Sequence, residues 1–363
     1  MKICVYAISL NEEKHIKRFC DAALDADLIF VVDTGSTDDT IEKYIAQAGS
    51  YDFPRLSKFQ YREISVKPWR FDDARNAALA LIPSDIDVCV SLDLDEVLQP
   101  GWRAEIERVW VEGTTRLRYG FDWGCGIAFK YEKIHARHGY RWHHPCHEYP
   151  VPDRIEEKWA DTDMLLVVHK PDSTKPRSQY LDLLRISIEE DPQCPRNGFY
   201  YARELSFAQQ WDQAIVQAQR YLALPRATWP NERAYAMRVI GRCYQEIGNA
   251  WQALAWFRRA TSEAPDTREP WHDLALAAYR GSRWYECFAA AQMCLSITNR
   301  ELVYTVDPAV WGAAPHDLLS IAAYNLGHFE IARDHAQKAV YLDPDDLRLR
   351  QNLQFCVDKV KAA

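Results

Sequence analysis

Val88-Cys89-Val90-Ser91-Leu92-Asp93-Leu94-Asp95-Glu96 is an apolar run of strand length that ends in three carboxylates within four residues. A short apolar run bounded by polar residues is typical of a strand buried in a parallel sheet. In open α/β sheets, ligands bind just outside the carboxyl ends of such strands. Because neighbouring carboxylates repel each other, we expect a divalent cation among them that holds a phosphate-bearing ligand. The alternative is the acidic first turn of a helix, where Asp and Glu are also favoured.

Length and composition limit the class of protein and the number of domains. The chain has 363 residues, which predicts about two domains. No apolar run reaches the ~20 residues that span a bilayer, and the first residues lack the apolar core of a signal peptide. Ten scattered cysteines favour a reduced, cytoplasmic protein over a disulfide scaffold. The net charge of -8 argues against a general nucleic-acid binder.

The first part of the chain, residues 1–175, alternates between strand and helix patterns. This alternation predicts an α/β domain with a mostly parallel sheet. From 115 to 168 the pattern changes to short strands rich in Arg, Tyr, Trp and Gly, which we expect to be antiparallel. The earlier strands are expected at 2–10, 27–32, 59–66 and 87–92, with helices at 12–23, from the turn at 33–40 to 48, and at 71–81.

A Pro- and Ser-containing stretch at 170–177 separates this half from a helical one. We predict a linker or helix at 176–197 and a helical domain at 198–363. Small and aromatic residues recur there with the spacing of tetratricopeptide repeats, in which paired helices pack closely and stack. The residues that carry the pattern are Gly241, Tyr244, Ala253, Phe257, Ala260 and Pro265, then Trp271 and Leu274 with Cys287 and Cys294 where Ala is usual, then Ala332, Ala339 and Pro344, with Ala214 in a divergent first copy and an insertion at 302–312.

Four motifs follow one another in the first half: Ile8–Glu13, Val32–Asp38, Ala74–Asn76 and Leu92–Glu96. Their order resembles glycosyltransferase family 2 over about residues 1 to 170. The resemblance implies a GT-A fold, a Rossmann-like sheet that binds nucleotide-sugar donors, and in particular UDP-sugars.

The resemblance also implies roles on the donor side. Asp33 would contact the nucleoside and Arg75 the nucleotide, while Asp93 would lie near the ribose and the metal. Thr34 stands where the family usually has a second Asp, so the resemblance does not determine which nucleobase the donor carries. Asp95 and the late His169 would ligate Mn²⁺ or Mg²⁺, hard cations that neutralise the departing diphosphate; for His169 a structural role is equally expected. The full set of expected donor-binding residues is Ser9, Asn11, Glu12, Asp33, Gly35, Arg75 and Asp93.

Inverting transfer needs a base that deprotonates the acceptor. Glu148 is the candidate, with His147 lining the site, because similar repeat-bearing enzymes carry a His-Glu pair there. The alternative is a Glu148 that simply pairs with an arginine. Asp122 and Trp123 would contact the sugar or acceptor, or else pack as aromatic core. A zinc site is a further alternative for the cluster of His143, His144, Cys146 and His147, with Cys125 upstream, although its spacing matches no standard motif.

The acceptor stays open. A peptide or protein acceptor is expected, with the repeats presenting it, forming a homodimer, or only bracing the fold. Transfer to a glycan, a lipid-linked sugar or a modified nucleic-acid base is the alternative, and a non-catalytic scaffold is the third. A local basic surface would serve an anionic acceptor; its candidates are Arg116, Arg118, Lys130, Lys133, Arg137 and Arg141.

Overall fold

The computed structural model describes residues 1–53, 55–172 and 179–362. The chain divides into two compact units. The first comprises Met1–Ser187 with Leu302–Tyr304, and the second comprises Ile188–Glu301 with Thr305–Ala363. The break predicted at 170–177 lies largely outside the described residues.

A mixed sheet of eight strands forms the centre of the first unit, in the order β3-β2-β1-β4-β7-β6-β10-β5. β3, β2, β1 and β4 are parallel neighbours, whereas β7 is antiparallel to both β4 and β6. A separate two-stranded ribbon consists of β8 and β9. The strands are β1 (Ile3–Ser9), β2 (Leu28–Asp33), β3 (Phe59–Glu63), β4 (Val88–Ser91), β5 (Glu96–Leu98), β6 (Arg116–Gly124), β7 (Ile127–Ala136), β8 (Tyr140–His143), β9 (Tyr149–Pro152) and β10 (Trp159–His169).

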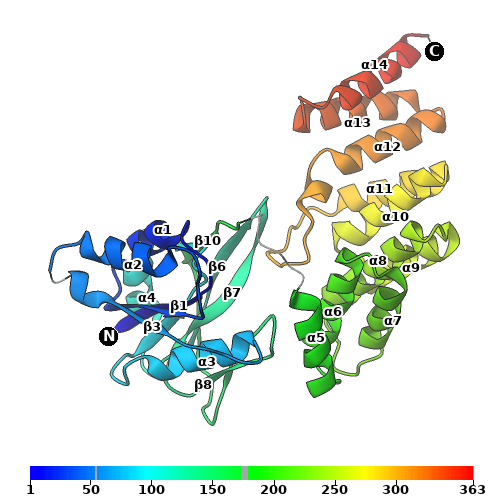
Figure 1. Ribbon diagram of the computed structural model, residues 1–363. Helices are drawn as coiled ribbons and strands as arrows, with labels where there is room; N and C mark the ends of the chain where they lie inside the picture. The colour runs from blue at the N-terminus through cyan, green and yellow to red at the C-terminus, as the bar shows by residue number, and fades with distance from the viewer. Residues whose placement is uncertain (54, 173–178, 363) are drawn as a thin grey trace. The chain divides into compact units, whose positions relative to one another are not determined.

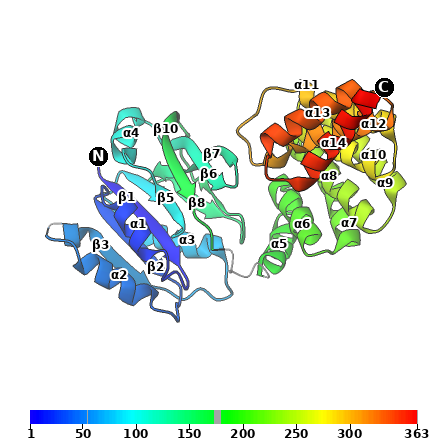
Figure 2. The same ribbon diagram turned by 90° about the horizontal axis from the view of Figure 1, so that it is seen from above.

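Helices cover both faces of this sheet (Figure 1). Because side chains alternate along a strand, each central strand supplies two cores. Val5 and Val90 pack with α1 (Ile16–Ala23), α2 (Thr40–Gly49) and α4 (Trp102–Val109), while Tyr6 and Cys89 pack with α3 (Phe71–Leu81) and Trp142. The view in Figure 2 shows the same division of the helices. Burial on both faces explains why β1, β2 and β4 are continuously apolar.

The parallel half of the sheet and α3 agree with the sequence prediction, but two expectations were wrong. α1 begins at Ile16 rather than at 12, because residues 10–15 form a loop that turns at Asn11 with φ 57°. The strands after 115 are not all antiparallel, since β10 runs parallel to β6 along most of its length. β10 is also longer than the short strands expected in this region, because it runs from Trp159 to His169.

The second unit is helical throughout its regular structure. Successive helices α6 to α13 form four pairs, followed by α14 (Figure 1). The insertion predicted at 302–312 lies between two of these helices and contains a short 3₁₀ turn at Pro308–Trp311. The helices are α6 (Pro195–Phe207), α7 (Trp211–Leu222), α8 (Pro230–Glu246), α9 (Ala250–Glu263), α10 (Arg268–Arg280), α11 (Trp284–Ser296), α12 (Ala314–Asn325), α13 (Phe329–Leu342) and α14 (Leu347–Ala362), and α5 (Gln179–Glu190) precedes them at the junction of the units.

Small residues set the spacing within these pairs. A Cβ on Gly241 of α8 would lie 2.6 Å from the ring of Phe257 on α9, so any side chain at this position would force the ring to shift. Ala253 and Ala260 are buried on the same helix as Phe257. Cys287 and Cys294 are fully buried where alanine is usual, and act as small apolar residues. The helical pairs therefore have the tetratricopeptide packing that the sequence predicts.

Among the described residues, no helix is long and apolar enough to cross a membrane.

Candidate functional site

The acidic segment of residues 92–96 forms a tight turn between β4 and the edge strand β5. Leu92 and Leu94 are each 1% exposed and anchor the turn in the core, which directs the intervening carboxylates away from it. The amide of Glu96 donates to the carbonyl oxygen of Asp93 at 2.9 Å, and the Glu96 carboxylate accepts from the amide of Asp93 at 2.9 Å. The segment is thus a loop closed on itself rather than the first turn of a helix.

Two cations hold the carboxylate of Asp93. Arg75 Nη2 donates to Oδ1 at 2.5 Å and Lys133 Nζ to Oδ2 at 3.2 Å. Burial raises the pKa of this carboxyl, but the charges of Lys133 and Arg75 outweigh burial and the pKa falls below its ordinary value. Asp93 is therefore ionised and oriented by side chains from α3 and β7.

Lys133 bridges to Glu96 as well, with Nζ 2.8 Å from Oε1. Glu96 is 3% exposed, and burial raises its pKa to about 7 against the opposing pull of Lys133, with Asp93 adding to the rise. Sequence reasoning assigned Lys133 only to an outer basic surface. The alternation along β7 does not reveal its inward position, because that depends on the register in which Val90 pairs with Ile134.

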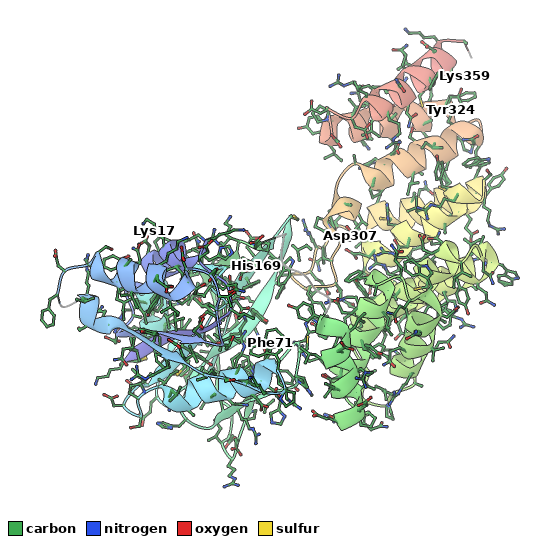
Figure 3. All side chains as sticks on the ribbon, viewed as in Figure 1. Lys17, Phe71, His169, Asp307, Tyr324 and Lys359 are labelled. Carbon is green, nitrogen blue, oxygen red and sulfur yellow. The ribbon has the colours of Figure 1, made fainter. Side chains whose placement is uncertain are left out.

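Asp95 faces His169, the last residue of β10. Asp95 Oδ2 lies 3.3 Å from His169 Nε2, and the amide of Lys170 donates to the carbonyl oxygen of Asp95 at 2.7 Å. Burial lowers the pKa of His169, but the hydrogen bond and charge of Asp95 outweigh it and leave the pKa raised. The ring also lies against Trp123, with centroids 4.3 Å apart (His169 is labelled in Figure 3). The two expected metal ligands are thus adjacent.

Arg75 links this turn to the segment that contains Glu148. Its guanidinium is buried, lies 4.8 Å above the Trp142 ring, and donates from Nε to Glu148 Oε1 at 2.5 Å. The pairing of Glu148 with an arginine, the alternative to a catalytic base, is therefore present. Asn76 holds the ribbon beneath Arg75, because its amide exchanges two hydrogen bonds with the backbone of Trp142.

A buried polar network lies under the same tryptophan. Trp142 Nε1 donates to the Tyr6 hydroxyl at 2.9 Å, and this hydroxyl lies 3.2 Å from His135 Nε2. His135 is fully buried, and burial lowers its pKa to about 4. The floor of the site is therefore neutral at pH 7.

Hydrogen bonds join the two loops that are expected to bind the nucleotide-sugar donor. Asp33 accepts hydrogen bonds from the Ser9 hydroxyl at 2.8 Å and from the amides of Gly35 and Ser36 at 2.9 and 2.8 Å. Asn11 Oδ1 accepts from the amide of Thr37 at 2.7 Å. The amide of Glu12 donates to Thr40 Oγ1, also at 2.7 Å. These side chains and amides shape the two loops at the ends of β1 and β2, and the nucleoside contact of Asp33 stays a prediction.

The remaining predicted residues lie around this centre. Asp122 accepts from the amide of Gly124 at 2.9 Å and so closes the β6–β7 hairpin, while Trp123 beside it is 45% exposed. His147 adopts φ 52° and stacks on Tyr180 with ring centroids 5.8 Å apart.

The zinc alternative finds no support in the described part of the chain, where no three His, Cys, Asp or Glu side chains gather as a metal-holding group. His143 and His144 present their rings to each other edge-on, and the His144 ring also approaches Tyr149. These histidines therefore have aromatic neighbours in place of a shared ion.

Most of the predicted basic surface is neutralised within the first unit. Arg116 pairs with Glu157 at 3.1 Å, Arg118 with Glu132 at 3.2 Å and Lys130 with Asp161 at 2.9 Å. Arg137 donates to the carbonyl oxygen of Ile82. The bonds of Arg137 leave its charge uncompensated, and Arg141 is exposed with no ion pair among the described residues, so the basic surface is neutralised only in part.

Comparison with known proteins finds likeness among solved structures, at low sequence identity. No protein-family model and no curated protein matches the chain. The crystal structure of the MamA protein is similar at 16% identity over 46% of this chain and 82% of that one, with a TM-score of 0.38. YrrB, a TPR protein with an unusual peptide-binding site, matches at 13% identity over 50% and 85% with a TM-score of 0.41. A TPR protein of Thermus thermophilus matches at 16% over 50% and 90% with a TM-score of 0.34. Likeness at this level carries no argument about activity.

Proposed function

We propose that the first unit is a metal-dependent, inverting glycosyltransferase of the GT-A type. It would transfer a sugar from a nucleotide-sugar donor, a UDP-sugar, to a peptide or protein acceptor. One observation carries the proposal: Arg75 gathers Asp93 and Glu148 beside the Asp95–His169 pair. The residues predicted separately to bind the nucleotide, to ligate the metal and to act as the base thereby lie beside one another.

The residues fit a divalent cation at Asp95 and His169. The carboxylate and imidazole atoms that face each other are 3.3 Å apart, as two ligands of one ion can be. Two protein ligands suffice when substrate phosphates and water complete the shell, as is usual for Mg²⁺. Asp93 is engaged by two cations and fits an orienting role better than direct ligation. When bound, Mn²⁺ or Mg²⁺ would neutralise the charge that develops on the departing diphosphate.

Glu148 is proposed to accept the proton of the acceptor hydroxyl as its oxygen attacks the anomeric carbon. Its 2.5 Å contact with Arg75 fixes the position of the carboxylate. The fastened loops at Asp33 and Asn11 would present a rigid surface to the nucleoside.

For the acceptor, the paired basic side chains favour a peptide or protein over a nucleic acid. Glycan transfer remains the second candidate among acceptors. A non-catalytic scaffold would need neither a buried Arg75 between two carboxylates nor an acid–imidazole pair beside it.

Donor binding tests the proposal first. We expect UDP with Mn²⁺ to raise the melting temperature, and Asp95→Asn to abolish this rise. Glu157→Gln is the matched control, because Glu157 pairs with Arg116 outside the site. The absence of any shift with UDP, GDP or other nucleoside diphosphates would favour the scaffold.

Measuring sugar transfer tests whether Glu148 is the catalytic base. A panel of nucleotide sugars with candidate peptides, followed by mass spectrometry, should reveal a hexose addition. Glu148→Gln should still bind UDP and Mn²⁺ yet lose transfer by two or more orders of magnitude. Retained transfer in this variant would show that another group is the base.

A further inference from the structure

A hollow beside the end of β10 is lined by basic side chains that the proposed function does not use. Its volume is about 400 Å³, within the range of small-ligand pockets. Its lining comes from the start of α1 and from the residues that follow His169. We call it the α1 pocket; it is lined by Lys14, His15, Arg18, Lys170, Pro171 and Asp172.

The charges of the α1 pocket are not balanced. Three cationic side chains line it against the single carboxylate of Asp172, which lies 3.2 Å from Lys14 Nζ. Two positive charges are therefore uncompensated, in a chain whose net charge is -8. Such a local excess needs an explanation, because the most buried arginines of the first unit, Arg75 and Arg116, pair with carboxylates.

Arg18 is the clearest case. Its Nη2 donates to the carbonyl oxygen of Lys170 at 3.3 Å and to His15 Nδ1 at 2.9 Å. Its Nε is buried and has no hydrogen-bond partner among the described residues. A buried donor without a partner costs about 1–3 kcal/mol. None of the described carboxylates lies within ion-pair distance of Arg18, so an anion that enters the pocket would meet both the unpaired donor and the charge.

The residue types indicate the ligand. A guanidinium presents a planar fork of donors that matches the oxygens of phosphate, and lysine adds a mobile point charge. Two uncompensated positive charges match a doubly charged oxyanion better than a single carboxylate. We propose that the α1 pocket binds a phosphoryl oxyanion.

The location gives the pocket a role beside the candidate site. The amide of Lys170 is bonded to Asp95, and His169 precedes it directly. A phosphoryl group in the pocket could belong to the donor diphosphate or to a separate phosphorylated compound. The proposal needs neither glycosyl transfer nor a metal, because free pyrophosphate presents the same chemistry.

Titration with inorganic pyrophosphate, without metal and at low salt, tests the pocket by calorimetry. We expect Arg18→Gln to weaken binding at least ten-fold, and Lys14→Gln to weaken it several-fold. Lys17→Gln is the matched control: Lys17 lies on α1 too (Figure 3) but is 76% exposed and pairs with Asp21 outside the pocket. Circular dichroism would confirm that each variant is folded. Lys14 is 65% exposed, so its variant remains informative if Arg18→Gln unfolds.

Competition distinguishes the two sources. If the donor diphosphate fills the pocket, UDP displaces pyrophosphate, and Arg18→Gln weakens UDP binding while uridine binding is unchanged. If a separate phosphate fills it, UDP and pyrophosphate bind together and the Arg18 variant keeps its UDP affinity. The proposal is wrong if the wild type takes up no pyrophosphate, or if the Arg18 and Lys14 variants bind it as tightly as the wild type.

Discussion

Lys133 is a buried cation that holds two carboxylates of the candidate site, Asp93 and Glu96. Its side chain is 6% exposed and contacts both Asp93 and Glu96, so removing it leaves the buried Glu96 without its counter-charge and Asp93 with Arg75 alone. We expect Lys133→Met to lower the free energy of unfolding by about 3–5 kcal/mol, as measured by urea denaturation. Lys130→Met is the control, because its partners are exposed and such pairs contribute less than about 1 kcal/mol. If both variants lost the same free energy of unfolding, the Lys133 ion pairs would contribute no more to stability than the exposed pairs of Lys130.

His135 predicts a pH dependence of stability. Its folded pKa of about 4 lies below the ordinary value of 6.5, so between these values the unfolded state binds the proton more tightly. Its contribution is complete above about pH 6.5 and is lost as the pH falls toward 4, by on the order of 3 kcal/mol. Urea denaturation at pH 7 and pH 5 measures it, and His135→Asn should reduce the difference between them. An unchanged difference, or an imidazole that titrates near 6.5 by NMR, would contradict this.

At the scale of single residues, the sequence analysis anticipated that Asp95 and His169 lie close together, but it did not anticipate most other contacts of the candidate residues. Asp95 and His169 lie 74 positions apart in the chain, and the resemblance paired them in one role. The contacts of Arg75 could not be predicted, because they depend on the register of β7 and on where the residues after β8 return to α3. Periodicity reports which face of an element is buried, but it does not report which charges meet there.

Among the helices, the α8–α9 pair depends on the absence of one methyl group. We expect Gly241→Ala to destabilise the repeat unit by about 1–3 kcal/mol, because a Cβ there would lie 2.6 Å from Phe257. Gly198→Ala on α6 is the matched control: its nearest neighbours are at 3.6 Å, so it should be neutral or stabilise by up to about 1 kcal/mol. Thermal unfolding of both variants measures this. A Gly241 variant as stable as the wild type would mean that Phe257 moves aside freely.

Elements with strong periodicity were the most predictable. α3 occupies the expected residues 71–81, and the parallel strands differ from expectation only at their ends. The helix predicted from residue 12 was wrong because hydrogen bonds between Asn11 or Glu12 and the next loop compete with the first helical turn. The parallel pairing of β6 with β10 was not predicted, since strand pattern indicates burial but not direction.

For the whole molecule, two separate cores predict two steps of unfolding. The sheet unit and the repeat unit have their own clusters of buried side chains. We expect guanidinium denaturation, followed by circular dichroism, to show two transitions. Lys133→Met should move only one of them and Gly241→Ala only the other. A single transition shifted by both substitutions would show that the units unfold together.

Arg75 also constrains the order in which residues of the candidate site can be substituted during evolution. Asp93 and Glu148 share this one guanidinium, so losing Arg75 first leaves Glu148 without its cation and Asp93 with Lys133 alone. Losing one acid first leaves less negative charge for Arg75 to compensate. The second substitution then costs less than it would alone, since neighbours in one network are not additive. Mutational histories of this protein should therefore show the three residues kept together or replaced together, with few surviving intermediates.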